Sequence, residues 1–330
     1  MRLPSKLPDS PKNPVADDLA AAQLGHQVFF DARFSSNQQV RCGTCHEPEL
    51  YFTDGDPTST GLVTVTRNSP SLYASPFLHW QMWDGKADSL WSQPLLAFEN
   101  PKEMDFTRLE IAHRLELSYR AQYEAIFGAL PDLSRFPARG KPGDVAWDSL
   151  SAADRETIDA VVSNLGRALE AYERKLAMRP GRFDAYLDGD ATKLNDQERE
   201  GLRVFVTAGC SQCHGGGLLT DESFHALQVP GSDERGRAEG LELLARSEFK
   251  GDDVPAPTAA DEFAWKTPSL RNVARTAPYG HNGHFATLEE VVDFHLPANV
   301  KPAERTALLS FLQALTAGDP PSPWNNWPNR

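Results

Sequence analysis

The motif Cys-x-x-Cys-His occurs twice in this chain, at residues 42–46 and again at residues 210–214. The two copies contain all four cysteines of the chain: Cys42, Cys45, Cys210 and Cys213. No cysteine is left for a structural disulfide, and 330 residues are enough to bury a stable core without one. The fold must therefore accommodate, twice, a chemical group that uses two thiols and the histidine behind them.

Zinc, a redox disulfide and covalent haem are the three groups to consider. Zinc needs four ligands at one site, usually from two nearby cysteine pairs or from one pair and two closely spaced histidines, and neither arrangement occurs here. A single four-cysteine site across the fold would leave both histidines unused. A thioredoxin-like pair belongs where a strand leads into a helix, whereas the flanks here have the patterns of helices and loops. Covalent haem uses every residue of the motif, because each thiol adds to a vinyl group and the histidine ligates the iron.

We therefore interpret both motifs as attachment sites for c-type haem, with His46 and His214 as the proximal iron ligands. Haem is attached in this way outside the cytoplasm, so we expect a periplasmic protein. The first residues, MRLPSKLPDSPKNP, lack the apolar stretch of a secretion signal, as expected for a mature form whose signal has been removed.

Neither nucleic acid nor a membrane is an expected partner. The formal net charge of −13 repels phosphate groups. No apolar run approaches the roughly 18–20 residues that cross a bilayer. The excess of acidic over basic residues would attract a basic partner, and it equally favours solubility.

The second axial ligand decides what each haem does, because two protein ligands make an electron carrier and an open position makes a reactive site. Methionine occurs only at positions 1, 82, 104 and 178, so the second half of the chain offers none to its haem. Its histidine candidates are His225, His281, His284 and His295. In the first half the candidates are His26, His79, His113, Met82 and Met104, and the sequence alone places none of them.

His295 has the best local argument among these candidates. The segment TLEEVVDFHL opens with a capping box, Thr287 and Glu290, which predicts a helix start. At helical spacing, His295 shares a face with apolar residues, and such a histidine is usually a core residue unless a haem lies beside it. We predict a second haem held by two imidazoles, which would have a lower reduction potential than one with His/Met ligation.

The chain resembles the bacterial di-haem cytochrome c peroxidase and MauG family along most of its length. The resemblance rests on the order and spacing of these segments: LGHQVFFDARFS, CGTCHEPELYFTDG, RNSPSLY, MWDGKADSLWSQ, NPKEM, ALEAYERKL, RFDAYL, CSQCHGG and KTPSLRNVARTAPYGHNGHFATLEEVVDFH. It implies a mainly α-helical protein with two cytochrome c-like domains, each with one covalently bound c-type haem. In this family the N-terminal haem reacts with hydrogen peroxide and the C-terminal haem receives and passes on electrons.

The resemblance also assigns roles to three residues of the first half. Trp83 matches the tryptophan between the haems, which relays electrons. Glu103 matches the distal glutamate, which moves a proton between the two peroxide oxygens, and Gln93 matches a glutamine that supports it. Taken alone, Trp83 would more often be a core aromatic and Glu103 a solvated carboxylate. Ala97 stands where the family commonly has a proline beside the haem.

Two departures from the typical peroxidases of the family bear on the irons. Those enzymes carry a loop histidine that ligates the resting N-terminal haem, whereas the matching segment here, DPTSTGLVTVT at residues 56–66, has none. The resemblance then implies an open, five-coordinate first haem that needs no reductive activation. Position 295 matches the sixth ligand of the second haem, which is methionine in typical peroxidases and tyrosine in MauG. His295 differs from both and would be a third type of ligand at this position.

The family also holds a calcium ion between its domains, through positions that match Asn68, Thr276 and Pro278. Oxygen ligands from side chains and backbone carbonyls suit calcium. Asn68 is equally well explained as a turn residue that bonds its own backbone. Calcium is therefore the third expected cofactor, after the two haems.

The segment 155–178 has a helical stripe of apolar residues and ends at Arg-Pro-Gly, so we predict a long helix there. We place the domain boundary after it, which gives an N-terminal domain, 1–178, and a C-terminal domain, 179–330. Residues 131–150 and 229–260 are rich in proline and glycine and are expected to be surface loops. The proline-rich C-terminal tail cannot be a helix, and its tryptophans are expected to dock on the surface.

The leading interpretation is a peroxidase that takes electrons from a small cytochrome c or cupredoxin. A MauG-like oxidase of a protein or organic substrate is the alternative. MauG has a surface tryptophan two residues before its second motif, where this chain has Ala208, so an exit for oxidising equivalents would have to use Trp265 or the tail. A non-enzymatic di-haem electron carrier and a peroxide sensor are the other classes, and a homodimer is compatible with each.

Overall fold

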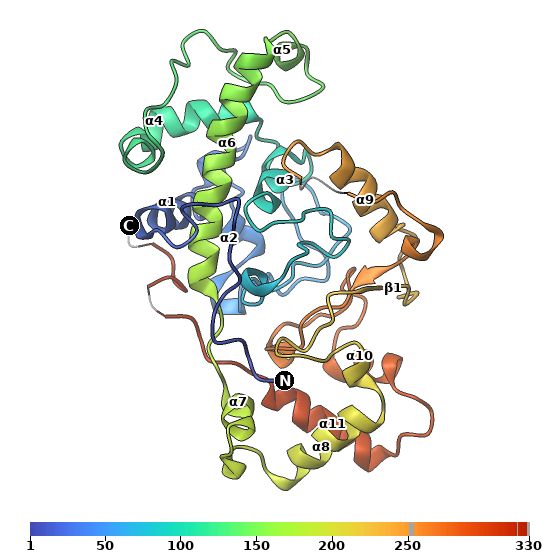
Figure 1. Cartoon of the computed structure of the whole chain (residues 1–330). Helices are drawn as coiled ribbons and strands as arrows, with labels where there is room; N and C mark the ends of the chain where they lie inside the picture. The colour runs from blue at the N-terminus through green and yellow to red at the C-terminus, as the bar shows by residue number, and fades with distance from the viewer. Residues whose placement is uncertain (251–253, 322, 329–330) are drawn as a thin grey trace.

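The computed structural model describes residues 1–250, 254–321 and 323–328 (Figure 1). It is mainly helical, as the sequence predicted. The helices of the first half are α1 (Leu19–Phe29), α2 (Cys42–Cys45), α3 (Gln93–Glu99), α4 (Arg108–Phe127), α5 (Val145–Asp148) and α6 (Ala152–Glu173). Those of the second half are α7 (Arg182–Leu187), α8 (Asp196–Thr207), α9 (Arg237–Arg246), α10 (Leu288–His295) and α11 (Pro302–Ala314). Two short strands, β1 (Phe224–His225) and β2 (Trp265–Lys266), pair antiparallel.

Two hydrophobic cores organise the chain. The first draws on residues between Leu3 and Met178, joined by Phe249 and Ala317. The second draws on residues between Phe183 and Leu315. The boundary predicted after residue 178 falls between these two sets, and the assignment of two domains stays a prediction.

Each core is built on one close crossing of two helices, α1 with α6 and α8 with α11. In Figure 1, α6 runs down one side of the molecule with α1 beside it, and α8 and α11 lie together at the far end from α5. Glycine makes both crossings close. A Cβ atom on Gly25 of α1 would overlap the carbonyl group of Ala168 on α6, and one on Gly201 of α8 would overlap that of Ala307 on α11.

The long helix predicted at 155–178 is confirmed, as α6 followed by a single 3-10 turn, Arg174–Leu176. Every residue of its predicted apolar stripe is buried: Ile158, Val161, Val162, Leu165, Leu169, Tyr172 and Leu176. The capping box predicted for α10 is also confirmed, since the Thr287 side chain accepts from the Glu290 amide and the Glu290 side chain from the Thr287 amide.

The loop predictions are only partly right. Residues 131–150 are mostly irregular but contain the single turn of α5. The prediction of a loop over 229–260 is wrong for α9, where buried Leu241 and Leu244 fix a ten-residue helix between flanks rich in glycine and proline. Residues 251–253 of that segment lie outside the described residues.

The described part of the C-terminal tail is not helical, and its tryptophans dock as predicted. Trp324 and Trp327 pack against the first core, so the tail crosses back from the second half (Figure 1). The Tyr172 hydroxyl donates to the Trp324 carbonyl oxygen over 3.1 Å, and the Trp327 indole donates to Glu47 over 3.1 Å. No helix among the described residues is long and apolar enough to cross a bilayer.

Alanine at Gly25 or Gly201 tests the two crossings. Alanine favours a helix over glycine by about 1 kcal/mol, but each new methyl group would press on a carbonyl of the partner helix, and overpacking of this kind costs about 1–3 kcal/mol. We expect each variant to lose about 1 kcal/mol of unfolding free energy on balance, measured by denaturant titration of the haem-loaded protein. Gln23→Ala, on the exposed face of α1, is the control and should lose none. Glycine variants as stable as wild type would contradict the close crossing.

Candidate functional site

The first motif forms α2, and His46 follows directly at its C-terminal end. The Nδ1 atom of His46 lies 2.9 Å from the carbonyl oxygen of Phe52. A carbonyl oxygen can only accept, so Nδ1 carries the proton and the Nε2 lone pair is free to bind a metal. Burial lowers the pKa of His46, which also keeps the imidazole neutral. This is the arrangement of a haem-ligating histidine.

The second motif repeats this arrangement on a 3-10 turn that begins at Cys210. The Nδ1 atom of His214 lies 3.1 Å from the carbonyl oxygen of Leu219, and burial lowers the pKa of this histidine too. The Nδ1 atom of His295, at the end of α10, lies 2.8 Å from the carbonyl oxygen of Val291. In all three histidines a backbone carbonyl fixes the ring and leaves Nε2 as the free ligand atom.

His214 and His295 line one cavity of about 460 Å³. Cys210 and Cys213 also line it, and its wall is largely apolar, including Phe205, Leu270, Val273, Leu288, Val292, Leu308 and Leu312. A covalently bound haem with two histidine ligands would need two thiols, two imidazoles and an apolar wall. The residues present therefore fit a haem, held covalently by the two thiols.

His225 and His281 line the same cavity but have other partners. The Nε2 atom of His225 lies 3.0 Å from a carboxylate oxygen of Asp221. His281 stacks flat on Trp265, with ring centroids 3.7 Å apart, and burial lowers its pKa to about 4. His284 stands edge-on to Phe285 near the loop that precedes α10. The buried Nε2 atom of His281 has no hydrogen-bond partner among the described residues, so these contacts do not exclude His281. His295 is favoured because, like His214, its Nδ1 atom is fixed by a backbone carbonyl oxygen.

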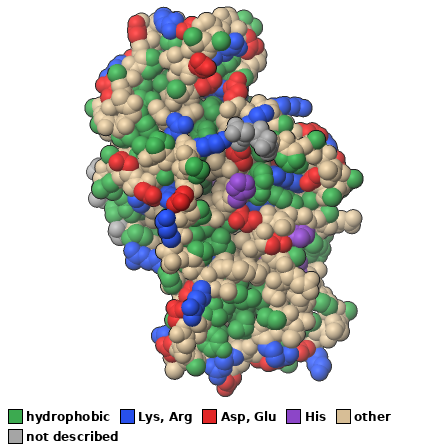
Figure 2. All heavy atoms as spheres, viewed as in Figure 1, with side chains coloured by type: hydrophobic (Ala, Val, Ile, Leu, Met, Phe, Trp, Pro, Cys, Tyr) green, Lys and Arg blue, Asp and Glu red, His purple; other side chains and the backbone are tan. Residues whose placement is uncertain are grey.

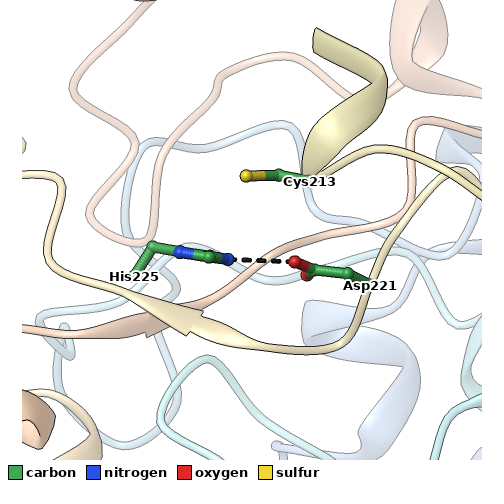
Figure 3. A group of neighbouring side chains, drawn as sticks. All are labelled: Cys213, Asp221 and His225. Atoms are coloured by element: carbon green, nitrogen blue, oxygen red, sulfur yellow. Dashed lines mark hydrogen bonds and ion pairs between the residues drawn. The ribbon is translucent and has the colours of Figure 1, made fainter. Parts of the chain in front are cut away.

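Asp221 and His225 also lie beside Cys213, with their ligand atoms within 4.8 Å of one another (Figure 3). A cysteine, a carboxylate and an imidazole so placed could bind a metal ion. Cys213 is, however, the second thiol of its motif, and a thioether is a poor metal ligand compared with a thiolate. We therefore interpret this group as an ion pair at the edge of the haem attachment.

Glu103 lies close to the first motif. It follows α3, and the Asn100 side-chain amide donates to its carboxylate over 2.6 Å. Burial raises the pKa of Glu103, and the positive charges of Lys86 and Arg67 oppose the rise. Burial, with smaller contributions from acidic groups that include Glu103, raises the pKa of the thiols of Cys42 and Cys45.

The segment 56–66 is bonded to the Glu103 segment. The amide of Leu62 donates to the Glu103 carbonyl oxygen over 3.0 Å, and that of Val63 to the Lys102 carbonyl oxygen over 3.1 Å. Gly61 permits this approach, since a Cβ atom there would lie 2.7 Å from the Cα atom of Glu103. The segment that lacks the loop histidine is therefore a fixed neighbour of Glu103.

Trp83 lines the second cavity. Its indole donates to the Asn68 carbonyl oxygen over 2.9 Å, and its own carbonyl oxygen accepts from the Lys266 amide over 2.9 Å. One residue earlier, Met82 contacts Gln93, whose side-chain amide lies 3.6 Å from the methionine sulfur. The structure thus brings Trp83 to the second site and connects its turn to Gln93.

The predicted calcium positions, Asn68, Thr276 and Pro278, all line this same cavity. The Asn68 side-chain amide donates to the Asp56 carbonyl oxygen over 2.9 Å, which leaves its Oδ1 atom for another partner. The structure brings the three residues to one wall, and calcium binding stays a prediction.

Candidates for a sixth ligand in the first half have other partners. The Nε2 atom of His26 lies 2.9 Å from the Asn326 carbonyl oxygen, and that of His113 lies 3.0 Å from the Pro137 carbonyl oxygen. His79 stands edge-on to Trp80. Met104 is buried in the first core.

Sequence reasoning missed several charged residues of this region. Arg67 bridges Asp84 at 2.5 Å and Glu234 at 3.1 Å, and so links the two halves of the chain. Glu173, at the end of α6, is a buried carboxyl whose pKa burial raises to about 8. The sequence could have identified Glu173 as a buried carboxyl, because it lies beside Tyr172 on a strongly apolar helical stripe. No local pattern pointed to Arg67 or its partners.

A family model described as di-haem cytochrome c peroxidase matches residues 19–192. The cytochrome c551 peroxidase of Pseudomonas aeruginosa is 30% identical over 96% of this chain and 84% of its own length. The methylamine utilization protein MauG of Methylorubrum extorquens is 28% identical over 96% of this chain and 83% of its own.

Two solved structures share the fold. One is a MauG-like protein associated with microbial copper homeostasis, 26% identical, with a TM-score of 0.71 over 99% of this chain and 98% of that one. The other is the diheme peroxidase BthA from Burkholderia thailandensis, 22% identical, with a TM-score of 0.72 over 95% of this chain and 91% of that one.

Removing one pair of thiols tests the attachment sites. The double variant Cys42→Ala/Cys45→Ala should lose one covalent haem and keep the other, and Cys210→Ala/Cys213→Ala should do the converse. Intact-mass spectrometry of the denatured protein counts covalent haems, because thioether bonds survive unfolding. His295→Ala leaves all four thiols in place and should keep both haems. Two covalent haems in either double variant would refute the assignment.

Proposed function

The chain belongs to the di-haem cytochrome c peroxidase and MauG family, and on that premise we propose that it is a periplasmic peroxidase. It reduces hydrogen peroxide to water at an open N-terminal haem held by Cys42, Cys45 and His46. The electrons arrive through a C-terminal haem held by Cys210, Cys213, His214 and His295. Family membership alone fits a peroxidase and a MauG-like oxidase equally, so the choice rests on particular residues.

The observation that carries the proposal is the carboxyl of Glu103, which is part-buried near the first motif and has its pKa raised by desolvation. A bound haem supplies the iron at which the O–O bond of peroxide is cleaved. Glu103 supplies the proton transfer: its carboxylate takes a proton from the near oxygen and returns it to the far oxygen, so that water can leave. The Asn100 amide, 2.6 Å from the carboxylate, holds it in place for this task. Gln93, near Met82, would support the distal pocket.

An open first site is supported by the segment 56–66. It contains no histidine, and its backbone is bonded to the residues around Glu103. A ligand loop that must leave on activation would need freedom to move, whereas this segment is tied at Leu62 and Val63. The proposed enzyme therefore needs no reductive activation.

The choice of peroxidase over a MauG-like oxidase rests on the surroundings of the tryptophans. Ala208 replaces the surface tryptophan that MauG has before its second motif. Trp265 is buried, and the guanidinium of Arg67 lies 5.0 Å from its ring centre. Arg41 lies 4.6 Å from the ring centre of Trp327. A cation over an aromatic face opposes removal of an electron from that ring. These tryptophans are therefore poor exits, and a soluble electron donor fits better than a protein substrate.

The donor is proposed to be a small cytochrome c or cupredoxin. Positive and negative side chains are interspersed on the face shown in Figure 2, and no single sign of charge dominates it. A donor surface of mixed charge fits that face. The calcium ion, if held by Asn68, Thr276 and Pro278, would support the wall between Trp83 and the second haem.

Glu103→Gln tests the proposed catalytic step. Glutamine keeps the shape of the side chain but cannot accept the proton, so we expect the rate of the first reaction with peroxide to fall about 10²- to 10⁴-fold. Stopped-flow absorption after mixing with peroxide measures this rate. The spectrum of the oxidised variant should stay that of an open haem. Glu156→Gln, an exposed position on α6, should react like wild type. An unchanged rate in Glu103→Gln would refute the role of Glu103.

The pH dependence of the same rate tests the state of Glu103. Burial raises its pKa above the ordinary value of 4.5, so the carboxyl keeps its proton to a higher pH than a solvated glutamate does. Only the deprotonated form can act as the base. The second-order rate constant for peroxide should therefore rise with pH through a transition above 4.5 and level off at higher pH. Glu103→Gln should lack this transition, and its persistence in the variant would assign it to another group.

A further inference from the structure

Arg237, the first residue of α9, inserts its side chain into the turn that carries Trp83. Its guanidinium donates to the carbonyl oxygen of Gly85 over 2.7 Å and to that of Asp84 over 3.2 Å. These two carbonyls directly follow Trp83 in the chain. Arg237 is only 4% exposed, so this contact is made away from water.

Two aromatic rings, steeply inclined to each other, contact the guanidinium. Its central carbon lies 4.0 Å from the ring centre of Trp80 and 4.1 Å from that of Phe224. Trp80 belongs to the first half of the chain and Phe224, on β1, to the second. The planar guanidinium contacts both aromatic rings while one of its nitrogens bonds two carbonyls, and a lysine would keep a donor but lose the planar contact.

The turn and α9 pack closely against each other. Gly85 has a φ of 64°, and a Cβ atom there would overlap Arg237 and lie 2.6 Å from the ring of Phe224. Gly240, one turn along α9, has the same role, since a Cβ atom there would overlap the carbonyl oxygen of Asp84. The glycines therefore allow α9 to touch the backbone beside Trp83.

Other hydrogen bonds also hold the turn. The Gln81 amide donates to the Ala87 carbonyl oxygen over 2.9 Å and closes the turn, and the Lys266 amide on β2 donates to the Trp83 carbonyl oxygen over 2.9 Å. On the opposite side, Arg67 binds the Asp84 carboxylate. Arg237 differs from these contacts because its side chain donates hydrogen bonds to two carbonyl oxygens of the turn at once.

We propose that Arg237 is a positioning residue for electron transfer between the haems, because it holds the Trp83 turn against the second half of the chain. The inference rests on the proposed function, in which Trp83 relays the electron. Electron tunnelling weakens exponentially with distance, so the rate of transfer depends on how closely the turn holds Trp83 in place. A loosened turn would therefore slow the transfer and leave the chemistry at Glu103 intact.

The first readout is hydrogen exchange, which reports on the turn without any turnover. In Arg237→Ala the amides of Gln81 and Lys266, which bond the turn, should exchange about tenfold faster or more, because local opening costs less free energy. Arg235→Ala is the matched control: Arg235 lies two residues earlier, is half-exposed and pairs with Glu242 and Glu262. Exchange in the control should match wild type at these two amides.

The second readout is the rate of electron transfer. Protein reduced with stoichiometric dithionite is mixed with one equivalent of peroxide, which takes one electron from each iron and two protons and leaves as two waters. Absorption separates oxidation of the first haem from that of the second. Arg237→Ala should slow oxidation of the second haem severalfold, with oxidation of the first unchanged. Arg237→Lys keeps the charge and a donor nitrogen but loses the planar contact with the two rings, and should slow it less.

The outcomes separate the inference from the proposed function. If oxidation of the second haem is slower in Trp83→Phe but the Arg237 variants keep wild-type rates and wild-type hydrogen exchange, the inference about Arg237 is overturned. The role of Trp83 as a relay would then still stand. A Trp83→Phe variant as fast as wild type removes the relay and the inference together. A wild type whose first haem does not react with peroxide contradicts the proposed function, and the inference falls with it. If Arg237→Ala fails to retain both haems, Arg237→Lys decides, and wild-type behaviour there overturns the inference.

Discussion

The hydrogen bond from a histidine Nδ1 atom to a backbone carbonyl oxygen is the interaction on which the two sites depend. It fixes the rings of His46, His214 and His295 and leaves each Nε2 atom as a free ligand. Two of these rings line a single cavity in the second half, whereas the first motif has His46 and, near it, the part-buried carboxyl of Glu103. The two sites share the same motif and differ in the side chains around it. In the proposed function, that difference would let one haem serve as a carrier and the other as the reactive site.

Contacts between the halves fix the segments that join the sites. The turn after Trp83 is held by Arg237 and Lys266 from the second half and by Arg67 from the first. Arg67 also reaches Glu234, so the same arginine ties both sides. Both halves contribute contacts to the Trp83 turn, and electron transfer is therefore expected to depend on the interface as well as on either site.

The sequence predicted what depends on local spacing. Both motifs, the apolar stripe of α6 and the capping box before α10 follow from residues a few positions apart, and the structure confirms the helices. It did not predict α9, because glycine and proline on both sides outweighed a short apolar pattern that becomes buried only through tertiary packing. Arg237 and Arg67 were missed for the same reason, since their partners lie far away in the chain. The stack of His281 on Trp265 likewise joins segments whose contact no local pattern encodes.

The central claim is that the two irons differ, with one bound by imidazole on both sides and the other open. An electron paramagnetic resonance spectrum of the fully oxidised wild-type protein tests this most directly, because a five-coordinate ferric haem is high-spin and a bis-histidine haem is low-spin. The account predicts one high-spin and one low-spin signal of equal intensity. Two low-spin signals that persist after peroxide is added would contradict it.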